Sequence, residues 1–235
     1  MRRVLVAGLG ITLLAGAGCT STQEKADRLA AKGRQAFTER GVRVSKQNPA
    51  IRVLDTAVLS DENGSAAVVV LESRARRAQA RLPIAIDVRG GGRKTVFRND
   101  APGLEPSLTG LTVITAGRRS IWVNDQVTAA GTPRDVVARV GLPRGRAPRK
   151  IPVLRVGGVR LAREETTGLY ARGAVRNESA VEQRDLVLYG VARRGKRIVA
   201  AGRAQVRRVR PRGRESFRMF FIGDPRRAEL SISVP

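Results

Sequence analysis

Short runs of β-branched and aliphatic residues, each closed by glycine, proline or asparagine, follow one another along most of this chain and restrict it to a β-sheet fold. Several runs alternate between apolar and polar positions, as strands with one buried face do. In the first half the runs span residues 53–59, 66–71, 82–88 and 111–115, and in the second half 151–159, 168–176, 185–192, 197–209, 215–222 and 229–234. Because no amphipathic helix of useful length accompanies them, the pattern predicts an all-β sandwich.

Turn and linker signals divide this region into two parts. Asn63-Gly64 and the glycine triplet at 90–92 fall between runs of the first part, where tight turns are expected. Residues 143–150 are rich in proline, glycine and arginine and read as a linker between the parts. We therefore predict one sandwich domain over 42–142 and a second over 151–235.

The two predicted domains align with each other, which indicates an internal duplication. At a constant offset of 104, residues 66–96 lie over 170–200 without a gap. Further along, the offset is 96, and Gly117 pairs with Gly213. The difference of eight residues predicts an insertion in the first copy, around 98–108. The identities are few, so a chance alignment is the alternative.

Residues 1–19 have the layout of an export signal that ends in a cysteine. Two arginines precede an apolar stretch over 4–14, which is too short to span a membrane, since a span needs about 20 apolar residues. Small residues then lead to Cys19, the only cysteine of the chain. This layout resembles the lipobox of bacterial lipoproteins, with Gly16 standing where that family usually has a branched aliphatic residue.

The lipobox resemblance implies a signal peptide over 1–18, a diacylated Cys19, and a lipidated N-terminus with a polar tether over 19–41. Two acyl chains are the number that stable anchoring requires. We therefore expect the protein in the cell envelope, lipid-anchored to a membrane on its extracytoplasmic side. An ordinary secretory signal, with Cys19 incidental, is the alternative.

A set of ordered motifs marks the second predicted domain. They are Gly173, Val175 and Asn177 at a strand end, the run 186–190 (LVLYG), Gly195-Lys196 with Val199, and Pro211, Gly213 and Phe217. In this order they resemble the FxLYD domains of bacterial envelope lipoproteins, with Leu186 in place of the family's Phe and Gly190 in place of its Asp. The resemblance implies two tandem immunoglobulin-like β-sandwich domains, more faintly for the first, and no catalytic residues.

The composition excludes most catalytic chemistry. Histidine is absent, and the only cysteine lies outside the predicted domains, so neither a Ser-His-Asp nor a Cys-His arrangement can form. We predict that the protein is not an enzyme and that it uses no metal or other cofactor.

The charge balance is strongly basic. The chain holds 45 Lys and Arg against 20 Asp and Glu, a net charge of +25. Because the basic residues are dispersed, this charge is either a background of codon usage or a means of attracting polyanions. Specific nucleic-acid binding is not expected, because aromatic residues that would stack on bases are not interleaved with the basic ones.

The only tryptophan and four polar residues are candidates for a binding surface. Asn99 and Asp100 lie in the predicted insertion, and Asn124 and Asp125 closely follow Trp122. Their oxygens are of the kind that binds Ca²⁺. Residues of this type also begin turns at strand ends, and no calcium-loop spacing is present, so no metal is predicted. Trp122 would either form a binding edge with the insertion or belong to the core or a domain interface.

From these features we expect a non-catalytic, membrane-anchored envelope lipoprotein that binds or scaffolds an envelope protein or an anionic envelope polymer. The alternative is a ligand-binding accessory subunit of an envelope enzyme or transporter. A pocket lined by Trp122 and the insertion would favour that alternative.

Overall fold

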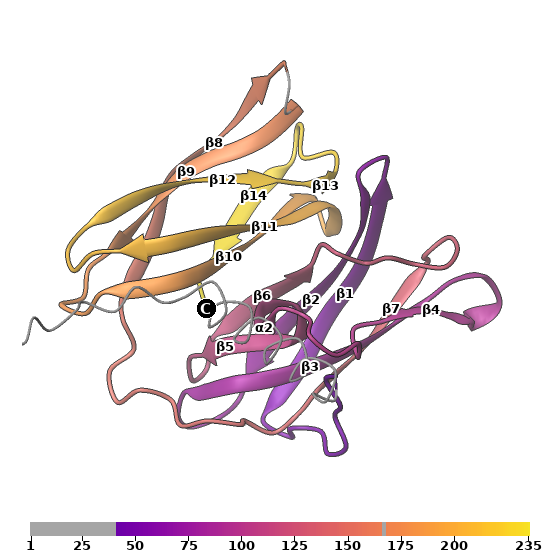
Figure 1. Ribbon diagram of the computed structural model, residues 1–235, viewed down its shortest axis with the longest axis horizontal. Coiled ribbons are helices and arrows are strands. Elements are labelled where there is room, and N and C mark those ends of the chain that lie inside the picture. Colours follow the sequence, from indigo (N-terminus) through magenta and orange to yellow (C-terminus); the bar gives the residue numbers. More distant parts are fainter. Residues whose placement is uncertain (1–40, 166–167) are drawn as a thin grey trace, which may run out of the picture. The chain divides into compact units, whose positions relative to one another are not determined.

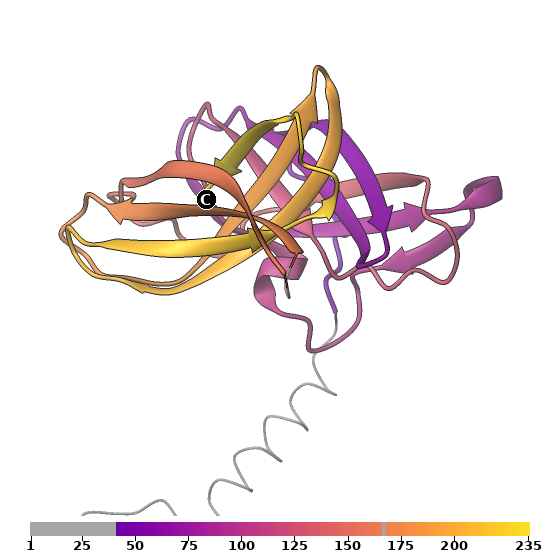
Figure 2. The ribbon, with the colours of Figure 1, turned by 90° about the horizontal axis from the view of Figure 1, so that it is seen from above.

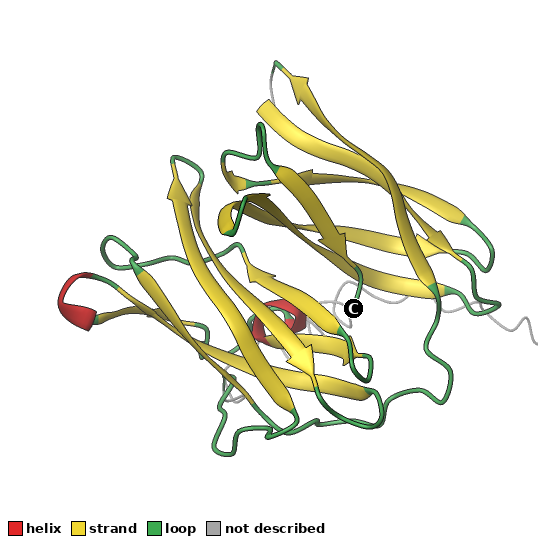
Figure 3. Cartoon of the chain, turned by 180° about the vertical axis from the view of Figure 1, so that it is seen from behind, coloured by secondary structure: helices red, strands yellow, loops and turns green. Residues whose placement is uncertain are grey.

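The computed structural model describes residues 41–165 and 168–235, and its regular structure is almost entirely antiparallel β-sheet (Figures 1 and 3), which confirms the predicted all-β sandwich class. The strands are β1 (Ile51–Asp61), β2 (Gly64–Ser73), β3 (Gln79–Arg89), β4 (Thr95–Arg98), β5 (Gly110–Ile114), β6 (Arg119–Asn124), β7 (Asp135–Val140), β8 (Leu154–Glu164), β9 (Gly168–Asn177), β10 (Gln183–Arg194), β11 (Arg197–Val209), β12 (Arg214–Phe220), β13 (Ile222–Gly223) and β14 (Glu229–Ser233). The helical segments in the described part are a 3₁₀ turn at Gly91–Arg93 and the one-turn helix α2 (Pro106–Thr109). No helix among the described residues is long and apolar enough to cross a membrane.

Two sheets face each other in the first half of the chain. The first sheet has the order β1-β2-β6. In the second sheet, β3 is the central strand: one of its edges pairs with β7, and its opposite edge pairs first with β5 and then with β4. Leu82, Ile84 and Ile86 alternate along β3 and are buried beside Trp122 of β6, as the period of a strand requires. The core of this half therefore consists mainly of aliphatic side chains around one tryptophan.

The second half repeats this arrangement with a sheet of order β13-β11-β10-β14 facing a sheet of order β12-β9-β8. Val175, Leu188, Phe217 and Met219 lie between these two sheets and are buried. The outer face of the sheet β12-β9-β8 carries exposed arginine side chains.

Corresponding strands of the two halves begin at a constant residue offset. The starts of β2 and β9, and those of β3 and β10, lie 104 residues apart, which is the offset of the sequence alignment. Arg81 in β3 and Asp185 in β10, also 104 apart, both have a left-handed backbone, with φ of 53° and 49°. Few non-glycine residues adopt such angles, so two of them at corresponding positions indicate the same local structure in both halves.

The eight extra residues of the first copy interrupt the strand that corresponds to β11 of the second copy. In the second half β11 pairs with β10 along the whole of its length. In the first half, β4 pairs with the end of β3 and β5 with its beginning, and the residues between them, including α2, leave the sheet. The segment 99–109 is called the inserted loop below.

The halves also pack on each other. Tyr189, Val191 and Ala201 of β10 and β11 belong to the same buried cluster as Val68 and Trp122 of the first half. Figure 2 shows the β10–β11 hairpin against the strands of the first half. Every residue from Ala66 to Leu71 is buried as a result, as expected for a strand covered on both faces.

The predicted linker 143–150 lies in the connection between β7 and β8 and is fastened to the first half. Gly145 forms a β-bridge with Ala80, and the Arg144 N–H donates to the Arg81 carbonyl at 3.1 Å. The division into two independently folding domains stays a prediction. The predicted signal peptide, Cys19 and the tether lie outside the described residues, apart from Gly41.

Candidate functional site

Asn99 at the start of the inserted loop takes the place of the missing strand. Its side chain is fully buried, and its Oδ1 accepts a hydrogen bond from the Ile86 N–H at 2.9 Å. Its Nδ2 donates to the carbonyls of Ile84 and Leu108, at 2.8 and 2.9 Å. Asn99 thus satisfies the backbone of β3 at the point where β4 has left the sheet and β5 has not yet joined it.

Trp122 and Asn124 hold the same loop from β6. The Trp122 Nε1–H donates to the carbonyls of Ser107 and Gly110, at 2.8 and 3.1 Å. The Asn124 Nδ2 donates to the Leu108 carbonyl at 3.4 Å, and its Oδ1 accepts from the Gln126 N–H. Both side chains are buried, so their contacts order the loop from within.

Residues of the second half of the chain also bond the inserted loop and its neighbour Asp125. Arg203 of β11, only 6% exposed, donates from Nε to Asp125 Oδ1 at 2.7 Å and from Nη1 to Ser107 Oγ at 2.5 Å. The Tyr189 hydroxyl donates to the Ser107 carbonyl at 3.2 Å, and burial raises the pKa of Tyr189 far above its ordinary value. Tyr189 is therefore a permanent donor here.

Four of the five predicted site residues thus converge on the inserted loop. Asn99 begins the loop, Trp122 and Asn124 bond to it directly, and Asp125 is joined to it through Arg203. Asp100, also in the loop, is exposed. The oxygens of Asn99, Asn124 and Asp125 accept bonds from the protein itself, and no group of three or more metal-binding side chains occurs in the described ranges. Arg203, Tyr189 and Ser107 were not predicted, because contacts between residues some 80 to 96 positions apart leave no local sequence signal.

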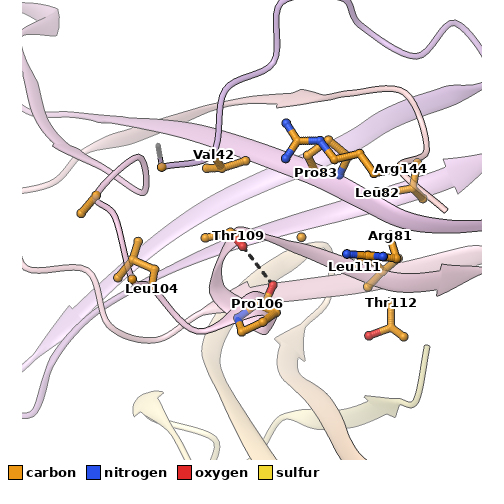
Figure 4. Close-up of a pocket in the computed structure, with 14 residues that line it drawn as sticks. Val42, Arg81, Leu82, Pro83, Leu104, Pro106, Thr109, Leu111, Thr112 and Arg144 are labelled. Carbon is orange, nitrogen blue, oxygen red and sulfur yellow. Dashed lines mark hydrogen bonds between the residues drawn. The ribbon is translucent and has the colours of Figure 1, made fainter. Parts of the chain in front are cut away.

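A pocket of about 740 Å³ opens on the outer side of the inserted loop (Figure 4). Leu104 and Pro106 of the loop line it together with Val42, Pro83 and the two cations Arg81 and Arg144. A Thr109 Oγ1 bond to the Pro106 carbonyl, 3.1 Å long, closes the turn at its edge. The pocket touches the predicted insertion, but Trp122 does not line it.

The outer face of the sheet β12-β9-β8 carries two rows of arginines, which we call the arginine face. In the strand register, Arg176 lies opposite both Arg155 and Arg214, and Arg172 lies opposite both Arg160 and Arg218. All six side chains are exposed. Like charges directly opposite each other on neighbouring strands are destabilising, so this grid costs the isolated protein stability.

Little negative charge offsets the arginine face. Arg155 pairs with Glu178 at 2.8 Å and Arg218 with Glu164 at 3.0 Å. The remaining four arginines make no salt bridge to any residue within 41–165 or 168–235: they are Arg160, Arg172, Arg176 and Arg214. Arg218 also lies over the ring of Tyr170, 5.1 Å from its centroid.

Small residues separate the two rows. Ala174 of β9 lies between Arg172 and Arg176, opposite Gly157 on one side and Ser216 on the other. A hollow of about 530 Å³ lies over this region, and we call it the furrow. Glu215 is the acidic residue among those that line it.

Comparison with protein-family models and with curated proteins finds no match for this chain. The likeness to lipoproteins and to FxLYD domains therefore stays a prediction from the motifs.

Proposed function

We propose that this protein is a non-catalytic envelope lipoprotein that binds an anionic polymer through its arginine face. The observation that carries the proposal is the alignment of six exposed arginines in two rows across three strands, four of them without an anionic partner among the described residues. A bound polyanion would remove the repulsion within each row and release counterions. The net charge of +25 would add long-range attraction to the same ligand.

The anchor in this proposal is Cys19, which lies outside the described residues. A diacylated cysteine holds the protein at the membrane surface, so the polymers within reach are those of the cell envelope.

A second candidate function is that of a ligand-binding accessory subunit of an envelope enzyme or transporter. The pocket beside the inserted loop favours it, because its volume of about 740 Å³ is in the range that accommodates a small molecule.

Lipidation is tested by metabolic labelling with a fatty-acid analogue. The wild-type chain is expected to carry the label and to fractionate with membranes, whereas Cys19→Ser is expected to lose both properties, because no other cysteine can be acylated on sulfur. An unlabelled wild type, or equal label on Cys19→Ser, would contradict the anchor.

Polymer binding is tested with the full chain, purified in neutral detergent, and with dye-labelled poly(glycerol phosphate) and poly-L-glutamate as probes. We expect at least one probe to bind with an affinity that falls steeply as salt rises. In Arg172→Gln/Arg176→Gln the slope of log affinity against log salt should be shallower by about two, one for each lost contact.

The matched control is Arg76→Gln/Arg77→Gln, which removes two exposed arginines from the turn between β2 and β3. Its salt slope should stay close to that of the wild type. If neither probe binds to the wild type at low salt, the proposed function fails. If the control pair lowers the slope equally, the positive charge acts as a uniform background and the arginine face has no special part.

A further inference from the structure

The furrow has a direction that follows from the strand register. Neighbouring strands lie about 4.8 Å apart, so the three arginines of a row follow one another across β8, β9 and β12 over about 10 Å. The rows are four residues apart on both β9 and β12, which is about 13 Å along an extended strand. The furrow therefore crosses the strands. Arg160, Arg172 and Arg218 of one row line it, and Arg214 lines it from the other row.

The residues between the two arginine rows, the floor of the furrow, are small and uncharged, so a polymer chain can lie over them but finds no charged group there. Gly157, Ala174 and Ser216 form the middle row, and the Ser216 hydroxyl is the polar side-chain group of that row. Arginine side chains reach well beyond these small residues, so those of the two rows extend above the floor on either side. A ligand lying on the floor meets positive charge to its left and to its right.

This arrangement favours anions whose oxygens point to both sides of the polymer chain. A phosphodiester is tetrahedral, and its two non-bridging oxygens share the charge and lie on opposite sides of the backbone. A side-chain carboxylate has both oxygens on one side, so it reaches one row only. Guanidinium groups bind phosphate oxygens through paired, charge-assisted hydrogen bonds.

We propose that the furrow binds a linear phosphodiester polymer, which crosses β8, β9 and β12 between the two rows of arginines. This inference rests on the proposed function and specifies its ligand. The span of about 10 Å limits direct contact to two or three repeating units, so two or three phosphates face the four arginines that have no salt bridge among the described residues.

The test compares three probes on the purified full chain in neutral detergent at one salt concentration. The probes are poly(glycerol phosphate), poly-L-glutamate of equal chain charge, and vesicles that contain phosphatidylglycerol. We expect poly(glycerol phosphate) to bind about tenfold or more tightly than poly-L-glutamate. Equal binding of both polymers would leave the proposed function standing and overturn the furrow as a phosphodiester site. Binding confined to vesicles would overturn both the furrow site and the proposed function, because neither polymer would then bind.

A charge placed on the floor tests the location. Ser216→Glu keeps all six arginines but sets a carboxylate in the path of the polymer, and we expect about five- to tenfold weaker binding of poly(glycerol phosphate) from like-charge repulsion. Thr115→Glu, an exposed position in the first half, adds the same charge and should change binding less than twofold. Equal effects of the two variants would place the ligand elsewhere, and circular dichroism of Ser216→Glu verifies that the sheet is retained.

Discussion

Replacing Trp122 by alanine is expected to lower the free energy of unfolding by about 3–5 kcal/mol, the range found for large aromatic residues removed from cores. The ring is fully buried and lies in the cluster that joins both halves of the chain. Its loss would leave a cavity beside Leu82 and Ile84 that the surrounding strands cannot close without leaving their register. Urea unfolding followed by circular dichroism measures the difference.

Trp122→Phe separates packing from hydrogen bonding. It keeps an aromatic ring in the core but removes the N–H that bonds the carbonyls of Ser107 and Gly110, so we expect a loss of about 1–3 kcal/mol. Equal stability of Trp122→Ala and wild type would mean that the tryptophan is not part of a packed core, and the described interior would be incorrect at its centre.

Truncating Arg203 to alanine is expected to cost about 2–3 kcal/mol. This is somewhat less than the roughly 3–5 kcal/mol for breaking a fully buried ion pair, because the partners of Arg203 are partly exposed. The guanidinium contacts Asp125 and Ser107 of the first half and lies 3.7 Å from Glu105. Removing it would leave the half-buried Asp125 without its cation and leave the Gln205–Glu105 hydrogen bond to hold the inserted loop to β11. The measurement is again urea unfolding, with Trp122 fluorescence as the signal, since Trp122 bonds the same loop.

Arg207→Ala is the matched control for this prediction. Arg207 lies four positions further along β11, is exposed, and makes no salt bridge in the described part of the chain, so its loss should change stability by less than about 0.5 kcal/mol. If Arg203→Ala and Arg207→Ala prove equal, the contacts of Arg203 contribute no more to stability than a surface charge does.

The local β pattern located many of the strands in advance. The expected run at 66–71 lies inside β2, that at 82–88 inside β3, and that at 229–234 coincides closely with β14. The short strands β4, β6 and β7 were not expected, because four to six residues carry too little alternation to stand out from their surroundings. Pairing with long partner strands orders these segments: β4 and β7 pair with β3, and β6 pairs with β2.

The candidate site, like the fold, was only partly predictable from the sequence. The sequence pointed to Trp122 and to the neighbouring Asn and Asp residues, since a lone tryptophan and clustered polar side chains are visible in any reading of the chain. It did not indicate that the side chain of Arg203 is buried against Asp125. It also did not show that Arg172 and Arg176 each have an arginine on both neighbouring strands, because cross-strand neighbours depend on register.

What the sequence alone determined is the class of fold and the offset between its two halves, because strand period, turn residues and a repeated pattern are local properties of a chain. What the tertiary structure decided is the use of each polar residue. Asn99 became the substitute for a missing strand, Trp122 the anchor of the inserted loop, and six dispersed arginines two facing rows. The physical reason is that the partners of these side chains lie on other strands, and only the assembled sheets bring them within the reach of a hydrogen bond or a shared ligand.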